Sequence, residues 1–221
     1  IAAARTLTLD AIRGGQPVTD PGASLAIAGN IIGPVGTTLA LTSTAMNAVS
    51  MGSIPSPLVG FASAPGTIVL RGDNTGFLGA VTLSNGVGLR AEGVNSISGK
   101  ALSLSGNNLS LLSDGNGSAG NEILPFNNPL TLTSAATVTV GRVGAGPLFT
   151  QASNKTAQIT SLNLAGGTAA LTVANNNGYG LSVSGATTLT ADTTFTINSG
   201  SASNLTPVSY THLRAHETEA D

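Results

Sequence analysis

A short pattern of alternating apolar and polar residues recurs along the chain. From Val81 the sequence reads VTLSNGVGL: apolar and polar residues alternate, a small-residue turn follows, and another apolar residue ends the pattern. The pattern starts again, with variations, at Leu7, Leu25, Leu39, Leu102, Leu130, Leu162 and Leu181. Alternation with a period of two predicts β-strands that bury one face. We therefore expect an all-β protein.

The spacing of these patterns indicates stacked repeats. From Val81 onward the successive starts lie 21, 28, 32 and 19 residues apart, and intervals of roughly 20 to 50 residues are typical of repeat architectures. Each pattern is too short to bury its apolar face alone, whereas stacked copies create a continuous aliphatic core. The predicted fold is a β-solenoid. A β-sandwich is the alternative, because short strands at regular spacing also build that fold.

Composition specifies the kind of core. Hydrophobic residues make up 41% of the 221 residues, but aromatic residues make up only 3% and charged residues only 8%. Packing therefore depends on Val, Ile, Leu and Ala, while Ser, Thr and Asn supply the polar face, and Gly and Asn suit tight reversals of the chain. The chain has no Cys, which excludes disulfides, thiolate metal sites and a cysteine nucleophile.

The chain divides into three segments of different character. Residues 1–65 form an irregular β-repeat segment, residues 66–207 the regular solenoid, and residues 208–221 break the pattern. The string VSYTHLRAHET from Val208 to Thr218 contains both His residues of the chain and resembles a translated sequencing adapter. We interpret residues 208–221 as a non-native tail. Because no initiating Met precedes Ile1, we expect an internal fragment of a longer protein.

Charge argues against nucleic-acid and membrane partners. Up to Pro207 the chain has seven basic and seven acidic residues, scattered along the sequence. Binding to nucleic acid or to a membrane surface depends on clustered Lys and Arg, so we expect neither partner. The sequence also contains no apolar run near the roughly 20 residues of a transmembrane helix.

The segment from Gly66 to Arg90, GTIVLRGDNTGFLGAVTLSNGVGLR, resembles the autotransporter-associated β-strand repeat. The positions that carry the resemblance are Gly66, Gly72, Asn74, Thr75, Phe77, Gly79, Gly86 and Leu89. An additional Gly76 displaces the usual aromatic residue, and the final turn is one residue longer than the usual ending. The later patterns share the strand-and-turn style without this signature.

This resemblance implies a right-handed parallel β-helix in the passenger region of an exported bacterial protein. It also implies a translocator barrel in a C-terminal part beyond this sequence, and it supplies no catalytic residues. We therefore expect a structural or adhesive surface-display segment at the bacterial cell surface. Its expected partner is an unidentified surface ligand, either a host molecule or a polysaccharide. We expect no enzyme activity, no cofactor and no metal site.

One local motif suggests a specific form of adhesion. Arg71-Gly72-Asp73 is the tripeptide that integrins bind when it lies on a protruding loop. Here it falls at the junction of a strand and a turn within the repeat. Tripeptides match by chance often, so two charged residues acquired at a repeat position are the simpler explanation.

Two alternative functions follow from the predicted fold. A carbohydrate-active β-helix enzyme needs a pair of carboxylates, and Asp73 and Glu92 are spaced about one repeat apart, so that they could stack on neighbouring rungs. An ice-binding β-solenoid needs a flat array of threonines, and pairs occur at Thr131 and Thr133, Thr137 and Thr139, and Thr194 and Thr196. Solvated charges and ordinary strand threonines explain these residues more simply.

Overall fold

The computed structural model describes residues 5–10, 24–44, 66–97, 99–144, 152–198 and 205–210. These residues form strands in two sheets and one 3-10 helix, η1 (Val94–Ser96). The seven-stranded sheet contains, in chain order, β2 (Ser24–Ile27), β4 (Thr67–Leu70), β6 (Gly88–Glu92), β8 (Asn108–Leu112), β11 (Ala136–Gly141), β14 (Ala170–Asn175) and β16 (Thr194–Asn198). The ten-stranded sheet contains β1 (Arg5–Asp10), β3 (Thr38–Thr44), β5 (Ala80–Ser84), β7 (Leu102–Leu104), β9 (Ile123–Pro125), β10 (Pro129–Leu132), β12 (Thr156–Ile159), β13 (Ser161–Leu164), β15 (Gly180–Leu189) and β17 (Leu205–Tyr210).

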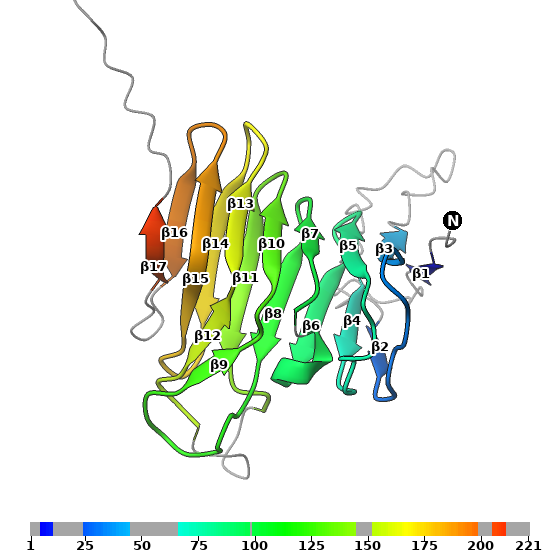
Figure 1. The fold of residues 1–221 in the computed structure, drawn as a ribbon, viewed down its shortest axis with the longest axis horizontal. Helices are drawn as coiled ribbons and strands as arrows, with labels where there is room; N and C mark the ends of the chain where they lie inside the picture. The colour runs from blue at the N-terminus through cyan, green and yellow to red at the C-terminus, as the bar shows by residue number, and fades with distance from the viewer. Residues whose placement is uncertain are drawn as a thin grey trace, which may run out of the picture.

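Both sheets are parallel, and the chain alternates between them. β4 of one sheet leads to β5 of the other, then to β6 beside β4 and β7 beside β5. Each of these circuits therefore adds one strand to each sheet, and the strands lie side by side along the molecule (Figure 1). Two later circuits add two strands to the ten-stranded sheet, β9 with β10 and β12 with β13. The prediction of an all-β protein is confirmed. The antiparallel pairing of a Greek-key sandwich does not occur among the described strands, and neither does an α-helix.

The ten-stranded sheet consists of two ladders that meet in β15. The first half of β15, residues 180–183, pairs with β12, which pairs in turn with β9. The second half, residues 187–189, pairs with β13, which continues the long ladder from β1. β15 thus crosses a corner of the stack, and the sheet curls. β9 and β12 form a third side, and Gly99 N from the segment after η1 donates to Phe126 O after β9 on this side (2.9 Å).

In-register pairing stacks equivalent apolar residues in columns. Leu41, Leu83, Leu104, Leu132 and Leu164 follow one another along the ten-stranded sheet, and each is at most 3% exposed. A matching column in the seven-stranded sheet contains Ile68, Leu89, Leu109, Val138 and Val173, each at most 1% exposed. Because neighbouring strands lie about 4.8 Å apart, each side chain contacts its equivalents above and below. This core accounts for most of the favourable free energy of folding.

Most of the predicted stacking is confirmed, and one part is wrong. The strands pair Val81 with Leu102, Leu102 with Leu130, and Leu130 with Leu162, at the predicted intervals. Leu181, however, does not stack on Leu162: Thr187 occupies that place, and Leu181 pairs with Ala157 on the third side. The error arises because β15 crosses the corner, so that its first half belongs to a different ladder from its second.

The strands also link the predicted segments. β2 and β3 from residues 1–65 pair with β4 and β5 from residues 66–207. β17 covers Leu205–Tyr210 and pairs with β15, so it spans the predicted start of the tail at Val208. The interpretation of residues 208–221 as non-native stays a prediction, and residues 211–221 lie outside the described part of the chain.

Glycines of the signature allow close contact between neighbouring rungs. A Cβ atom on Gly72 would clash with the carbonyl oxygen of Gly29, and one on Gly79 would clash with that of Thr37. Gly86 has a different role, because it follows Asn85 through a tight turn with positive φ angles of 71° and 54°. Only residues that tolerate the left-handed region fit such a turn.

Asn74 of the signature joins three rungs through its side chain, which is 2% exposed. Its Oδ1 accepts a hydrogen bond from Ile31 N (2.6 Å), and its Nδ2 donates to Ser96 O (2.8 Å). Phe77, 6% exposed, belongs to the core, and its N–H donates to Asn74 O (2.9 Å). The buried asparagine therefore satisfies backbone groups that the irregular corner leaves outside the ladders.

The stacked columns predict unequal effects of mutations at adjacent positions. Replacing Leu104, which is 0% exposed, by Ala should lower the free energy of unfolding by about 2–5 kcal/mol, because a cavity opens between two rungs. Ser103→Ala, on the outward face of β7, should change it by no more than about 0.5 kcal/mol. Denaturant unfolding of both variants measures the difference. Equal effects would show that Leu104 is not part of a packed column.

Candidate functional site

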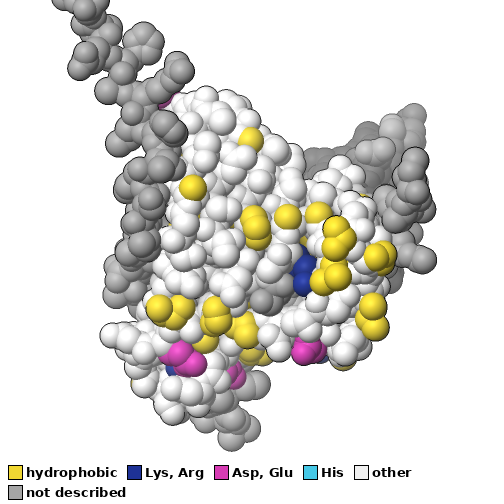
Figure 2. All heavy atoms as spheres, viewed as in Figure 1, with side chains coloured by type: hydrophobic (Ala, Val, Ile, Leu, Met, Phe, Trp, Pro, Cys, Tyr) yellow, Lys and Arg dark blue, Asp and Glu magenta, His cyan; other side chains and the backbone are white. Residues whose placement is uncertain are grey.

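Charged residues that are scattered in the sequence gather along one edge of the stack. Ten charged side chains are described. Eight of them lie at the end of a strand of the seven-stranded sheet or in the segment that follows it, and Arg90 lies within β6 and donates to Glu92 at its end. We name this group the charged edge: Arg71, Asp73, Arg90, Glu92, Lys100, Asp114, Glu122, Arg142 and Lys155. Acidic side chains are visible at this edge in Figure 2. With five basic and four acidic residues, the charged edge is nearly neutral rather than a basic patch.

Glu92 holds two arginines at one end of this edge. Its Oε2 lies 2.6 Å from Arg71 Nε, and its Oε1 lies 2.6 Å from Arg90 Nε. Arg90 Nη2 also donates to Val143 O (2.7 Å). Burial would raise the pKa of Glu92, but the hydrogen bonds from both guanidinium groups hold that pKa below its ordinary value. Glu92 therefore remains ionised and links β6 to neighbouring segments.

The Arg-Gly-Asp tripeptide lies at the junction of β4 and the following turn. Arg71 forms the ion pair with Glu92, and Gly72 is buried against Gly29. Asp73 Oδ1 accepts hydrogen bonds from Thr75 Oγ1 (2.7 Å) and Thr75 N (3.0 Å), which lower the pKa of Asp73. Both charged ends of the tripeptide thus have partners within the protein.

The proposed carboxylate pair does not share a partner in these contacts. Asp73 bonds to Thr75 and, through Oδ2, to Asn95 Nδ2 (3.4 Å). Glu92 bonds to the two arginines. Asp73 and Glu92 therefore occupy separate hydrogen-bond networks on the same edge.

The threonine pairs are divided between the two sheets. Thr137 and Thr139 both belong to β11, where Thr137 is followed in its column by Thr172 and Thr196. Ala174 follows Thr139. Thr131 lies in the other sheet, and Thr133 Oγ1 donates to Leu104 O (3.3 Å). A single column therefore contains three consecutive threonines, but the predicted pairs do not form one array.

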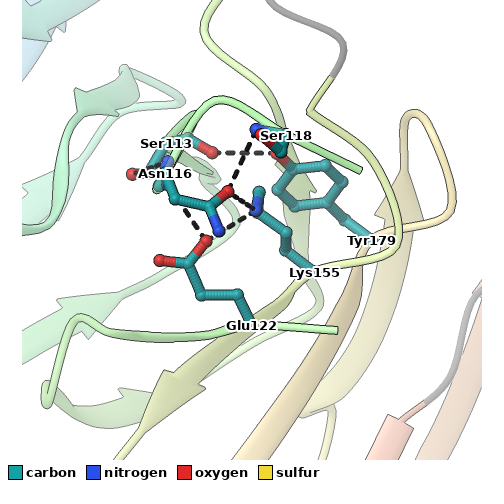
Figure 3. A network of polar contacts seen from close by, with 7 residues as sticks. Ser113, Asn116, Ser118, Glu122, Lys155 and Tyr179 are labelled. Carbon is teal, nitrogen blue, oxygen red and sulfur yellow. Dashed lines mark hydrogen bonds and ion pairs between the residues drawn. The ribbon is translucent and has the colours of Figure 1, made fainter. Parts of the chain in front are cut away.

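A second network centres on Lys155, whose side chain is 0% exposed. Lys155 Nζ lies 2.5 Å from Glu122 Oε2 and 2.7 Å from Asn116 Oδ1 (Figure 3). The same Oδ1 accepts a hydrogen bond from Ser118 N (3.0 Å), and Glu122 Oε2 accepts one from Asn116 N (3.0 Å). The hydrogen bond with Lys155, followed by that from Asn116 N, lowers the pKa of Glu122.

Tyr179 closes this network from the next rung. It is 0% exposed, and its hydroxyl donates to Ser113 O (3.0 Å), as Figure 3 shows. Burial, with a further contribution from Asp114, raises the pKa of Tyr179 to about 12. The hydroxyl therefore stays protonated. Together the loop after β8, the segment before β12 and the turn before β15 hold Lys155 in place.

An open hollow adjoins the Lys155 network on the third side. Its lining consists of Gly93, Val94, Asn95, Ser113, Gly115, Glu122, Ile123, Leu124 and Pro125. Glu122 is 31% exposed in its side chain, so the hollow connects the Lys155 network with solvent. No group of three or more potential metal-binding residues occurs in the described part of the chain.

Sequence reasoning missed the Lys155 network. Glu122 and Asn116 lie 33 and 39 residues before Lys155, and no local motif joins them. The one sequence signal that could have found the network is that lysine is rare: the chain contains only Lys100 and Lys155. Both are buried in the structure. A rare lysine in an alternating apolar sequence indicates a specific partner, because buried charges are almost always paired.

Comparison with protein-family models, with curated proteins and with solved structures finds no match to this chain. Within the described residues, no helix has the length and hydrophobicity needed to cross a membrane.

The contact between Gly72 and Gly29 makes a matched pair of substitutions informative. Gly72→Ala should lower the free energy of unfolding by more than about 1 kcal/mol, because the new methyl group must displace backbone. A Cβ atom on Gly76 would meet only the Ile32 side chain, at an ordinary van der Waals distance of 3.8 Å, and Gly76 has no positive φ angle, so Gly76→Ala should change stability by no more than about 0.5 kcal/mol. Thermal or denaturant unfolding of both variants and of the wild type measures the two changes in stability. A tolerated Gly72→Ala would contradict the close contact.

The ion pairs of Glu92 predict an acid-sensitive contribution to stability. Its pKa in the folded protein lies below the ordinary value of 4.5, so the contribution is fully present above that pH and is lost as pH falls through the folded value. Glu92→Gln should lower the free energy of unfolding by about 1 kcal/mol at neutral pH. The difference between variant and wild type should shrink in strong acid. An equal difference in the free energy of unfolding at neutral pH and in strong acid would contradict this role of the Glu92 ion pairs.

Proposed function

We propose that this chain is a structural or adhesive surface-display segment of a large exported bacterial repeat protein, folded as a right-handed parallel β-helix. The observation that carries the proposal is the in-register stack of parallel strands, with aliphatic columns inside and small polar residues outside. Connections between parallel strands are right-handed in about 98% of cases, which supports the handedness. Such a stack extends by adding rungs and so forms a scaffold.

The outer surface supports display rather than chemistry. One outward column of the ten-stranded sheet contains Thr82, Ser103, Thr131, Asn163 and Thr188. These side chains are short and uncharged, and they offer hydroxyl and amide groups at the spacing of the rungs. A polysaccharide or a host surface molecule is the partner that this surface fits, at the exterior of the bacterial cell.

The charged edge supports the same proposal. Glu92 joins two arginines, and Glu122 is paired with Lys155. Since buried or half-buried charges need partners, these residues hold the irregular third side to the regular sheets. We therefore assign them to the scaffold and propose no enzyme activity for this segment.

Surface display can be tested with the full chain placed between an export signal and an outer-membrane translocator barrel. We expect antibody to label intact cells and added protease to remove the label. A matched variant, Leu104→Asp, should reduce labelling because it disrupts the core and leaves a charge buried without a partner. Wild-type chain that folds in solution but remains inside the cell would contradict the display function.

Cells that display the chain also test which residues contribute to adhesion. Attachment to a panel of immobilised polysaccharides and host matrix proteins should be unchanged by Asp73→Glu, because Asp73 bonds to Thr75 within the protein. The outward variant Thr131→Lys should weaken attachment. A large loss with Asp73→Glu alone would instead support adhesion through Arg71-Gly72-Asp73.

A further inference from the structure

Lys155, Asn116 and Glu122 have the arrangement that amide transfer between two side chains requires. We propose that Lys155 Nζ and Asn116 Cγ become joined by an intramolecular isopeptide bond, with Glu122 as the general acid and base. The bond would link the loop after β8 to the segment before β12 on the third side of the stack. This inference goes beyond the display function and does not depend on it.

The nucleophile is already beside its target. Lys155 Nζ lies 2.7 Å from Asn116 Oδ1, and this oxygen is bonded to the carbon that the amine must attack. The side chain of Lys155 is 0% exposed, so its position is restricted by the surrounding protein. Holding two reacting groups in contact replaces a bimolecular encounter and supplies a large part of the rate enhancement.

Glu122 is placed to move the protons. Its Oε2 lies 2.5 Å from Lys155 Nζ, within hydrogen-bond reach of the proton that must leave the ammonium. The N–H of Asn116 donates to the same oxygen (3.0 Å) and fixes the carboxylate next to the electrophile. The open hollow lined by Glu122 provides a route by which the leaving group reaches solvent.

The carboxamide is polarised by a backbone donor. Ser118 N donates to Asn116 Oδ1 (3.0 Å), the atom that gains negative charge when the amine attacks. A preorganised N–H aimed at a developing oxyanion is among the stronger contributions to acyl transfer. The turn that supplies it includes Gly117, whose φ angle is 78°, and a positive φ angle favours glycine.

The reaction balances without any co-reactant. The Lys155 ammonium gives one proton to the Glu122 carboxylate, and the neutral amine attacks Cγ of Asn116 to form a C–N bond and an oxyanion. Glu122 then protonates the amide nitrogen of Asn116 and takes a proton from the attacking nitrogen. The carbonyl re-forms as the original C–N bond breaks and ammonia leaves. Ammonia takes the last proton from Glu122 and departs as ammonium.

A competing reaction gives the same loss of mass. Gly117 follows Asn116, and the backbone nitrogen of a residue after Asn can attack the same carboxamide to form a succinimide, also with loss of ammonia. The succinimide involves neither Lys155 nor a branch between two peptides. The two products are therefore distinguished by the connectivity of their fragments.

The test is mass spectrometry of the denatured full chain and of its tryptic fragments. We expect the intact mass to lie below the sequence mass by one ammonia. Trypsin cleaves after Lys100 and Arg142 but not after a modified lysine, so residues 101–142 and 143–214 should appear as one branched product. Its fragmentation should place the branch at Asn116 and Lys155.

Variants identify the role of each residue. Lys155→Met and Glu122→Ala should abolish the branched product, whereas Asn116→Asp should form it with loss of water in place of ammonia. Lys100→Arg is the matched control, because Lys100 is the other buried lysine, and it should leave the branched product unchanged. Circular dichroism reports whether each variant keeps its β-structure.

Two results would overturn the proposal. One is wild-type protein at its full sequence mass with no branched product, a result that needs no variant to fold. The other is loss of ammonia that persists in Lys155→Met, while the wild-type protein releases residues 101–142, 143–155 and 156–214 as separate fragments, which would assign the loss to a succinimide at Asn116.

Discussion

The in-register pairing of parallel strands is the constraint on which the rest of this structure depends. It places Leu83, Leu104 and Leu132 directly over one another, so each rung buries an apolar surface that it could not bury alone. The same register repeats the outward residues, and it returns the chain to the same corner after every circuit. Both the uncharged faces and the charged edge follow from this one geometry.

The regular part of the fold was predictable because strand alternation is a local property. Leu102, Leu130 and Leu162 stack as predicted although the intervals differ, since the extra residues lie in loops and leave the strands in phase. Leu181 was misplaced because alternation shows which residues point inward but not which side of the stack they line. β9 buries only Leu124, and β12 buries Ala157 and Ile159, so neither repeats the leucine-and-polar alternation by which β7, β10 and β13 were recognised.

The candidate site could not be predicted in the same way. The loops that connect successive strands have no common length, and their length decides which polar residues meet at the corner. Asn116 and Glu122 come from the loop after β8, whereas Lys155 comes from the next circuit. Gly72, Asn74 and Gly86, which carry the resemblance to a known repeat, lie at a close backbone contact, a buried hydrogen bond and a tight turn. The resemblance covers only residues 66–90, so it includes neither Asn116 nor Glu122 nor Lys155.

The proposed isopeptide bond would remove an energetic cost from the Lys155 network. Removing an ammonium group from water costs several kcal/mol, and an ion pair with a carboxylate repays this only where its geometry and the remaining hydrogen bonds are favourable. Lys155 is fully buried while Glu122 is partly exposed, so the lysine bears most of that cost. Conversion to an amide removes the buried positive charge and leaves Glu122 at the edge of the hollow, where water can solvate it. A chain without Cys would also gain a covalent link across its irregular third side.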